Sequence, residues 1–419
     1  MKALRVSLMV LTSLTTIHAQ GWRQQQSGVQ YALNSVTFSD SLNGWAVGNG
    51  LAILHTTNGG ITWGQLYLSP SSSPSYYMAK ILFTTASEGW IFGREGSAYR
   101  TTNTGVDWRT VSTGTAEDLY GAFFASPERG WVVGDHGLII ATTDQGATWL
   151  QQTVDSCDWL YGIHFVDSLC GWAVGDSGII LKTIDGGAQW FAVARGIGGW
   201  LGDVEFVDRS KGWVTGDSAS VWYTADGGAT WERQTMGAAL TAWDIEFTNS
   251  LHGWIAGGTP PGGSLPPVGL ILRTTDAGRT WITQNSGTTV CLFGLSFLDS
   301  LTGWAVGESG TILHTSNGGI TYVSPSDSDR SLPTAILDQN YPNPFNPQTI
   351  IKYHLASASD VSLKVYDVLG KEVARLVDER KTSGLHEVTL DATRLAGGVY
   401  FYQLRVEGAV QTMPMVLLK

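Results

Sequence analysis

The chain has 419 residues, enough for two or three domains with cores of their own, and charged residues make up only 15% of it. Its 52 glycines and 18 tryptophans favour an all-β fold with many tight turns and aromatic packing. The formal net charge of −11 argues against a nucleic-acid surface, which needs clustered Lys and Arg, and against electrostatic docking on anionic lipid.

Residues 1–19 have the features of a secretory signal peptide. Lys2 and Arg5 form a short basic region, an apolar stretch runs from Leu8 to Leu14, and Ala19 is a small residue before an expected cleavage at Gln20. That stretch is too short to cross a bilayer, and no later segment is long and apolar enough to do so. We therefore predict a secreted protein without a transmembrane segment.

A repeat of about 41 residues occupies the chain from residue 20 to residue 325. The dipeptide Gly-Trp recurs at steps of 45, 41, 41, 41, 41 and 50 residues, and a Phe lies six residues before each of its glycines. These glycines are Gly44, Gly89, Gly130, Gly171, Gly212, Gly253 and Gly303. Each unit contains four short apolar runs; in the fourth unit the expected strands are 160–166, 172–175, 179–183 and 189–194. The period predicts a seven-bladed β-propeller.

A second motif, Thr-x-Asp/Asn-x-Gly-x-Thr-Trp, joins the third and fourth strands of a unit, for example at 142–149 and 224–231. The Asp or Asn side chain accepts backbone N–H groups across the turn, Gly supplies a positive φ, and Trp folds back over the hairpin. The seventh unit closes with Tyr322 in place of Trp. The motif resembles the Asp-box, or bacterial neuraminidase repeat, and the whole unit resembles the propellers of photosystem II stability and assembly factors.

The seventh unit lacks a fourth strand of its own. Residues 22–28, Trp-Arg-Gln-Gln-Gln-Ser-Gly, match residues 281–287, Trp-Ile-Thr-Gln-Asn-Ser-Gly, which form the fourth strand of the sixth unit. We expect the N-terminal segment to complete the seventh blade, and so to hide strand edges that invite aggregation.

The three cysteines, Cys157, Cys170 and Cys291, lie far apart in the repeat and are odd in number. They do not form a disulfide framework, and we interpret them as small buried apolar side chains.

The binding surface is expected on the face that carries the loops between strands two and three and the loops between blades. Two insertions, at 69–75 and 259–267, lengthen loops of this face. The first strands begin there with aromatic residues: Tyr120, Trp159, Tyr161, Trp200, Trp243 and Phe293. Exposed aromatic rings suit contacts with sugars or proteins, and packing between blades is the alternative interpretation.

Four carboxylates form the strongest candidate for chemistry. Asp203 and Glu205 lie two residues apart on one first strand, and Asp244 and Glu246 take the same places on the next. First strands converge near a propeller's axis, so these groups can serve glycoside hydrolysis or bind Ca²⁺. A polar, solvated channel wall is the favoured interpretation, and His164 is interpreted as another channel side chain. We predict no cofactor and no metal.

Because Asp-boxes occur in sialidases, the resemblance also makes sialidase activity a hypothesis to test. That activity requires three arginines that clamp a carboxylate, and the expected inner strands contain no such set; the blade count is seven rather than six. We therefore expect a non-enzymatic binding or adhesion module for an extracellular glycan or protein. The alternative is a secreted polysaccharide-active enzyme that uses the inner-strand carboxylates.

A polar linker, 326–336, leads to a C-terminal segment, 337–419. The alternation of Val361, Leu363 and Val365 and the turn at 367–371 favour a small immunoglobulin-like β-sandwich.

This segment resembles the type A C-terminal sorting domain of type IX secretion. The residues that carry the resemblance are Tyr341–Pro347, Val365–Val373, Gly397–Tyr402 and the terminal Lys419. The resemblance implies that the type IX machinery exports the protein, through the periplasm, across the outer membrane of a Gram-negative bacterium. It also implies release from the cell or attachment to its surface.

Overall fold

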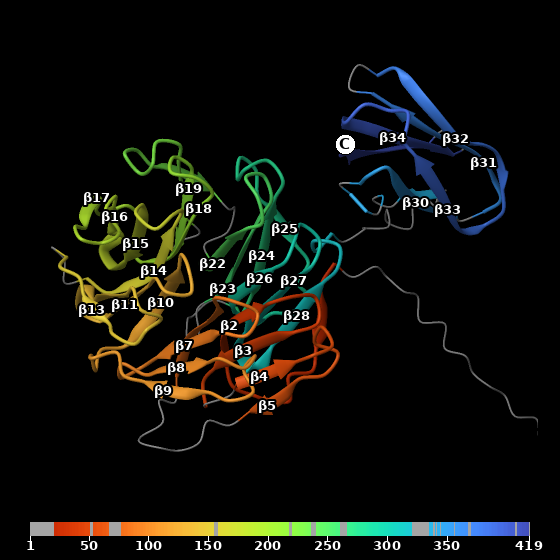
Figure 1. Ribbon diagram of the computed structural model, residues 1–419. Coiled ribbons are helices and arrows are strands. Elements are labelled where there is room, and N and C mark those ends of the chain that lie inside the picture. The colour runs from red at the N-terminus through yellow and green to blue at the C-terminus, as the bar shows by residue number, and fades with distance from the viewer. Residues whose placement is uncertain are drawn as a thin grey trace, which may run out of the picture. The chain divides into compact units, whose positions relative to one another are not determined.

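The computed structural model describes residues 21–50, 53–66, 77–154, 158–217, 220–235, 240–259, 266–320, 335–337, 340, 342–343, 345–355, 357–367, 370–406 and 409–418. The chain divides into two compact units, Met1–Tyr322 and Val323–Lys419 (Figure 1). Strands dominate both units, and three short 3₁₀ turns are the only helical elements in these ranges: η1 (Asp135–Gly137), η2 (Asp176–Gly178) and η3 (Glu308–Gly310).

In its described residues, the first unit consists of seven four-stranded antiparallel sheets, the blades. Blades one to four contain β2 (Leu33–Phe38), β3 (Gly44–Gly48), β4 (Ile53–Thr56) and β5 (Gly64–Leu66); β6 (Met78–Phe83), β7 (Gly89–Gly93), β8 (Ala98–Thr101) and β9 (Arg109–Val111); β10 (Leu119–Phe124), β11 (Gly130–Gly134), β12 (Ile139–Thr142) and β13 (Leu150–Gln151); β14 (Leu160–Phe165), β15 (Gly171–Gly175), β16 (Ile180–Thr183) and β17 (Phe191–Ala194). The strands of blade four agree with the expected ones to within two residues at each end.

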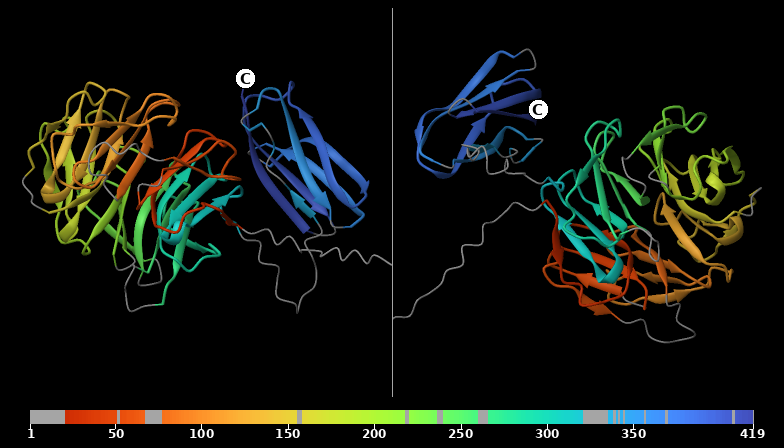
Figure 2. Two further views of the ribbon diagram at one scale, coloured as in Figure 1. Left: turned by 90° about the horizontal axis from the view of Figure 1, so that it is seen from below. Right: turned by 180° about the vertical axis from the view of Figure 1, so that it is seen from behind.

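Blades five to seven complete the set. They contain β18 (Leu201–Phe206), β19 (Gly212–Gly216), β20 (Ser220–Thr224) and β21 (Glu232–Thr235); β22 (Thr241–Phe247), β23 (Gly253–Gly258), β24 (Gly269–Thr274) and β25 (Ile282–Gln284); β26 (Leu292–Phe297), β27 (Gly303–Gly307), β28 (Ile312–Thr315) and β1 (Arg23–Gln25). The first strand of each blade contacts the first strands of its two neighbours, and β26 contacts β2, so the ring is closed (Figures 1 and 2). The predicted seven-bladed β-propeller is confirmed.

The N-terminal strand completes blade seven, as the sequence match predicts. β1 pairs antiparallel with β28, and Arg23, Gln24 and Gln25 face His314, Leu313 and Ile312. Tyr322 lies outside the described residues, and Trp22 takes the place of the closing tryptophan of this blade: its Nε1 donates to Oε1 of Gln284 at 2.9 Å. The corresponding Trp281 donates to Gln234 in the same way at 3.0 Å.

A stack of three aromatic rings links each blade to the one before it. Phe206 of blade five stacks on Trp172 of blade four with ring centroids 3.5 Å apart, and Trp231 of its own blade meets it edge-on at 6.1 Å. Gly212 is required beside Phe206, because a Cβ there would lie 2.5 Å from the phenyl ring. The Phe and Gly-Trp of the repeat therefore form the joint between blades.

The Asp-box is a turn held by its own side chains. In blade five the Thr224 hydroxyl donates to Asp226 Oδ1 at 2.8 Å and accepts the Gly228 N–H at 2.9 Å. Asp226 Oδ1 also accepts the Thr230 N–H at 2.9 Å. Hydrogen bonds from Thr230 and Thr224 lower the pKa of Asp226 to about 2, so the carboxylate is ionised and fully engaged in the turn.

The second unit is built from two sheets around one core. They are β29 (Ala335–Leu337), β30 (Gln348–Leu355) and β33 (Gly384–Asp391), and β32 (Glu372–Lys381), β31 (Ser359–Tyr366), β34 (Gly398–Val406) and β35 (Ala409–Leu417). Val361, Leu363 and Val365 are buried as their alternation predicts. Its first described strand, β29, starts at Ala335, two residues inside the expected linker, and pairs with β30. Its two sheets form a β-sandwich, and an immunoglobulin-like topology stays a prediction.

Several other expectations fall on the ends and loops of the chain. The signal peptide, Cys157 and most of the two insertions lie outside the described residues. Cys170 and Cys291 are buried and unbridged, as expected. No helix in the described ranges has the length and apolar character that a membrane crossing requires.

Candidate functional site

A register shift recurs at the start of the first strand of every blade. In blade six the pairing of β22 with β23 skips from Ala242 to Asp244, and in blade five the pairing of β18 with β19 skips from Leu201 to Asp203. Such a bulge leaves one residue unpaired and re-aims side chains. Trp243 and the adjacent Asp244 therefore both line the axial cavity, although neighbouring residues of a regular strand point to opposite faces.

The six predicted aromatic residues form one continuous arc across blades three to seven. From ring to ring, the centroid distances are 6.5 Å for Trp159–Tyr120, 5.1 Å for Tyr120–Tyr161, 5.3 Å for Tyr161–Trp200, 4.7 Å for Trp200–Trp243 and 5.4 Å for Trp243–Phe293. Five of them line a cavity of about 460 Å³ around the axis, which we call the aromatic cavity. Trp159 is the outer end of the arc and is 42% exposed.

Trp200 can join the arc because residue 202 is a glycine. Blade five has Gly202 at the bulge position where blades four and six have Tyr161 and Trp243. A Cβ on Gly202 would lie 2.4 Å from Cη2 of Trp200, so the indole fills the space that a side chain would take. The arc is thus unbroken although its blade-five member comes from the preceding loop.

The predicted carboxylates line the channel, and three of them also join blades. Asp203 Oδ2 accepts the Ile245 N–H at 3.2 Å and Asp244 Oδ2 accepts the Leu295 N–H at 2.6 Å. Both oxygens of Glu246 lie 3.1 Å from the Phe297 nitrogen. Each acceptor belongs to one blade and each donor to the first strand of the next. The first-strand edges therefore have partners at these places.

A lysine faces these carboxylates across the ring. Lys80 of blade two lines both the aromatic cavity and a second cavity of about 350 Å³, as do Asp203 and Asp244. We call these three residues, which line both cavities, the charged layer. Sequence reasoning missed Lys80, although an alignment of the seven first strands places it level with Asp203 and Asp244.

The electrostatics of the charged layer follow from burial and proximity. Burial, and then the charge of Asp244, hold the pKa of Asp203 well above its ordinary value, against the effect of Lys80. Burial lowers the pKa of Lys80, but the charges of Asp244, Asp203, Glu246 and Glu205 outweigh it, and the pKa rises. The charged layer thus favours the protonated form of Lys80.

The second cavity contains the remaining predicted polar residues. His164 Nδ1 lies 3.2 Å from Oε2 of Glu205, and Glu246 lines the same wall. Burial raises the pKa of Glu246 to about 8, although the carboxylate accepts the Phe297 N–H. His164 is therefore a channel side chain in position, as expected, with a carboxylate partner that the sequence did not indicate.

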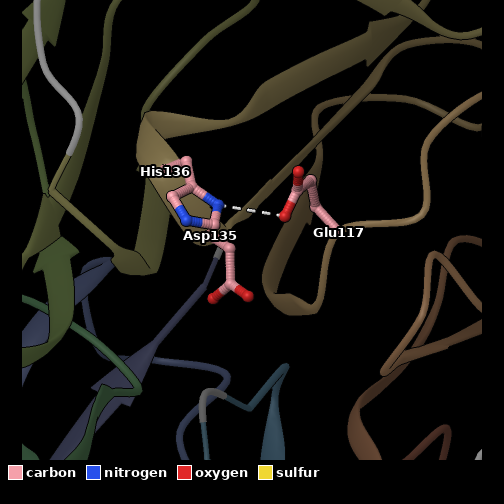
Figure 3. A group of neighbouring side chains, drawn as sticks. All are labelled: Glu117, Asp135 and His136. Atoms are coloured by element: carbon pink, nitrogen blue, oxygen red, sulfur yellow. Dashed lines mark hydrogen bonds and ion pairs between the residues drawn. The ribbon is translucent and has the colours of Figure 1, made fainter.

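One further cluster has the composition of a metal site. Nδ1 of His136 lies 3.0 Å from Oε2 of Glu117, and Asp135 lies beside them, with ligand atoms within 4.8 Å of one another (Figure 3). The ion pair accounts for two of the side chains, and Asp135 lies near the hydroxyl of Tyr120, where burial first and then Asp135 raise the pKa of that phenol. The cluster needs no metal to explain it, and sequence reasoning did not single it out.

Comparisons with known proteins match both units. The family profile described as Photosynthesis system II assembly factor YCF48 matches residues 14–115, 101–198 and 189–284, and that of the secretion system C-terminal sorting domain matches residues 339–417. No curated protein sequence matches the chain.

Solved structures show the same propeller. "YCF48 bound to D1 peptide" is 19% identical with a TM-score of 0.60 over 70% of this chain and 96% of that chain. "YCF48 from Cyanidioschyzon merolae" is 20% identical, with a TM-score of 0.58 over 70% and 98%. U3-55K is 11% identical, with a TM-score of 0.55 over 71% and 98%. At these identities the likeness concerns the fold alone.

Proposed function

Because the chain belongs to the family of the Photosynthesis system II assembly factor YCF48 and ends in a secretion system C-terminal sorting domain, we propose that its propeller is a non-enzymatic binding module, exported by that domain, whose ligand enters the aromatic cavity. The single observation that carries this proposal is the arc of six rings. Aromatic walls around a concave site with a few polar groups are the usual composition of a binding pocket. None of these six rings is fully buried, and none belongs to the joints between blades, which use other aromatic residues.

A peptide or protein ligand has a precedent in the family. A solved YCF48 propeller carries a D1 peptide according to its description. The shared fold does not transfer that ligand to this chain. The family match supports a binding role for the propeller.

The second candidate is a secreted polysaccharide-active enzyme. One observation favours it: the raised pKa values of Asp203 and Glu246 are of the kind that a general acid requires. Against it, Asp203, Asp244 and Glu246 accept backbone N–H groups of the next blade, which accounts for their presence.

The test is a screen of the secreted protein against peptide and polysaccharide arrays. For any ligand found, Trp200→Ala and Trp243→Ala should weaken binding by about tenfold or more, since each removes a large apolar contact. Phe191→Ala, at an aromatic ring 44% exposed on outer strand β17, is the control and should bind as the wild type does.

Melting curves of both tryptophan variants must show a folded propeller. Wild-type binding in both variants, or unfolding of both, would mean that the arc is structural. Turnover of a polysaccharide that is lost in Asp203→Asn and Asp244→Asn would instead support the enzyme.

A further inference from the structure

Building on the proposed function, we infer that the aromatic cavity receives a positively charged side chain, Lys or Arg, that a peptide or protein partner inserts end-on toward the charged layer. The inference names the class of ligand for the site and rests on three observations: the order of groups along the axis, the balance of charge and the behaviour of Lys80.

The order of groups along the axis matches an amphipathic side chain. The aromatic residues line the first cavity, and Asp203 and Asp244 stand where it meets the second. A Lys or Arg side chain has an apolar stem and a charged head. The stem would contact the aromatic walls, with cation–π attraction near the rings, and the head would reach the carboxylates.

The channel has more acidic groups than basic ones, and a cation placed beside Asp203 and Glu246, whose pKa values are raised, would favour their charged forms. Four carboxylates, Asp203, Glu205, Asp244 and Glu246, line the two cavities together with one lysine and one histidine. Two further acidic residues, Asp176 and Glu308, lie at the aromatic cavity. The Tyr161 hydroxyl donates to Asp176 Oδ2 at 3.4 Å, and Glu308 lines the aromatic cavity.

Basic residues of the surrounding loops do not offset this charge. Arg94 pairs with Asp118 at 3.2 Å, and Arg195 pairs with Asp158 at 3.7 Å. Neither arginine is among the residues that line the aromatic cavity. A cation in the cavity therefore gains the attraction of the carboxylates at short range in a partly desolvated space.

Lys80 is an internal example of the group that the site accepts. Its ammonium lies opposite Asp203 and Asp244, which favour its charged form although burial opposes it. The described ion pairs include none between Lys80 and these carboxylates. Lys80 would compete with the ligand for the same charge.

A neutral sugar chain fits this arrangement less well. The charged layer lies where the aromatic cavity meets the second cavity, so the innermost part of a ligand would contact carboxyl groups. The charged head of a single Lys or Arg side chain suits that position. A neutral ligand would also desolvate the carboxylates without offering them a charge.

The experiment measures the affinity of the full secreted chain for two peptides, acetyl-Gly-Gly-Lys-Gly-Gly-amide and its twin with norleucine in place of Lys. The twin keeps the stem and lacks the ammonium. Tryptophan fluorescence reports binding, because Trp200 and Trp243 line the cavity. We expect the Lys peptide to bind about tenfold more tightly than its twin.

Two kinds of variant should change the affinity for the Lys peptide in opposite directions. Asp203→Asn with Asp244→Asn keeps an oxygen for the Ile245 and Leu295 N–H groups and should abolish the preference for Lys. Lys80→Met removes the competing ammonium and should strengthen Lys binding several-fold. Asp208→Asn, in a turn of blade five, also removes a negative charge and should change nothing.

Equal affinity for both peptides, or a preference that survives in the Asn double variant, would overturn the cation inference and leave the proposed binding function in place. A Lys80→Met variant that binds Lys more weakly would overturn it as well, even where the Asn variants fail to fold. If neither peptide binds, and Trp200→Ala and Trp243→Ala leave binding to every array ligand unchanged, the proposed function fails together with the inference.

Discussion

Trp22 meets Phe297 edge-on, with ring centroids 5.9 Å apart and ring planes at 88°. The two residues are separated by almost the whole propeller in sequence, yet their geometry repeats that of Trp231 and Phe206, which lie within one blade at 6.1 Å and 89°. The N-terminal segment therefore supplies blade seven with both its fourth strand and its closing tryptophan, and it ties the first residues of the propeller to the last.

Loss of this contact should open the ring. Trp22 is 2% exposed, so Trp22→Ala should lower the free energy of unfolding by about 3–5 kcal/mol. Deletion of residues 22–28 should have a larger effect, with a large fall in melting temperature or loss of solubility, because it exposes the edge of β28. Thermal melts and sedimentation of the secreted protein provide the measurement.

Arg23→Ala is the control for this prediction, because Arg23 is exposed on the same strand and its truncation should cost no more than about 0.5 kcal/mol. A deletion variant with the melting curve of the wild type would show that the ring does not depend on β1.

The C-terminal module should be required for export and dispensable for folding of the propeller. Its core contains residues from Ala335 to Leu417 only, and the division between the two units falls after Tyr322. A chain that ends at Pro325 should melt at the temperature of the propeller in the full chain and should remain in the periplasm. Cell fractionation with antibody detection measures this, and the shortened chain at normal levels outside the cell would contradict it.

Much of the propeller can be predicted from the sequence because the repeated residues are the ones that pack against each other within and between blades. Phe206, Gly212 and Trp231 recur at fixed spacing, since the ring of the Phe lies over the Gly and against the Trp of the same blade. The match between 22–28 and 281–287 similarly locates the closing strand. That match also places Trp22 level with Trp281, and the two indoles make equivalent hydrogen bonds in their blades.

The candidate site was predicted less completely. The six aromatic residues and four carboxylates were identified from their place at the start of the first strands. The bulge that turns both Trp243 and Asp244 toward the axis has no signal in the alternation of residue types. Lys80 was missed because its partners, Asp203 and Asp244, lie three and four blades further along the chain, and only ring closure brings the three together.

The position of Trp200 should depend on the absence of a side chain at residue 202. In Gly202→Ala the new methyl group would lie 2.4 Å from the indole, so the ring must move out of the arc. Binding of any ligand of the aromatic cavity should fall several-fold, while the melting temperature should change by only a few degrees. Titration and thermal melts of the purified variant measure the two effects.

Gly64→Ala, on exposed strand β5, is the matched control, because its nearest atom, the His55 carbonyl oxygen, is 3.7 Å from the new Cβ. Undiminished affinity in Gly202→Ala would show that Trp200 does not contribute to the cavity as described.

The stability of the propeller should fall with rising pH, in part because of Glu246. Burial raises the pKa of this carboxyl to about 8 from an ordinary value of 4.5, so between these two pH values the folded chain retains a proton that the unfolded chain releases. Excess proton binding by the folded state means that stability decreases as pH rises through this window. Glu246→Gln keeps an oxygen that can accept the Phe297 N–H and removes the charge, so it should flatten this part of the profile and raise the melting temperature at pH 9 by a few degrees relative to the wild type.

Glu232→Gln, at an exposed residue of β21, is the control for this prediction and should follow the wild-type profile. Melting temperatures at intervals from pH 4 to pH 9 test the prediction, and a Glu246→Gln variant that melts below the wild type at pH 9 would show that the carboxylate stabilises the channel rather than straining it.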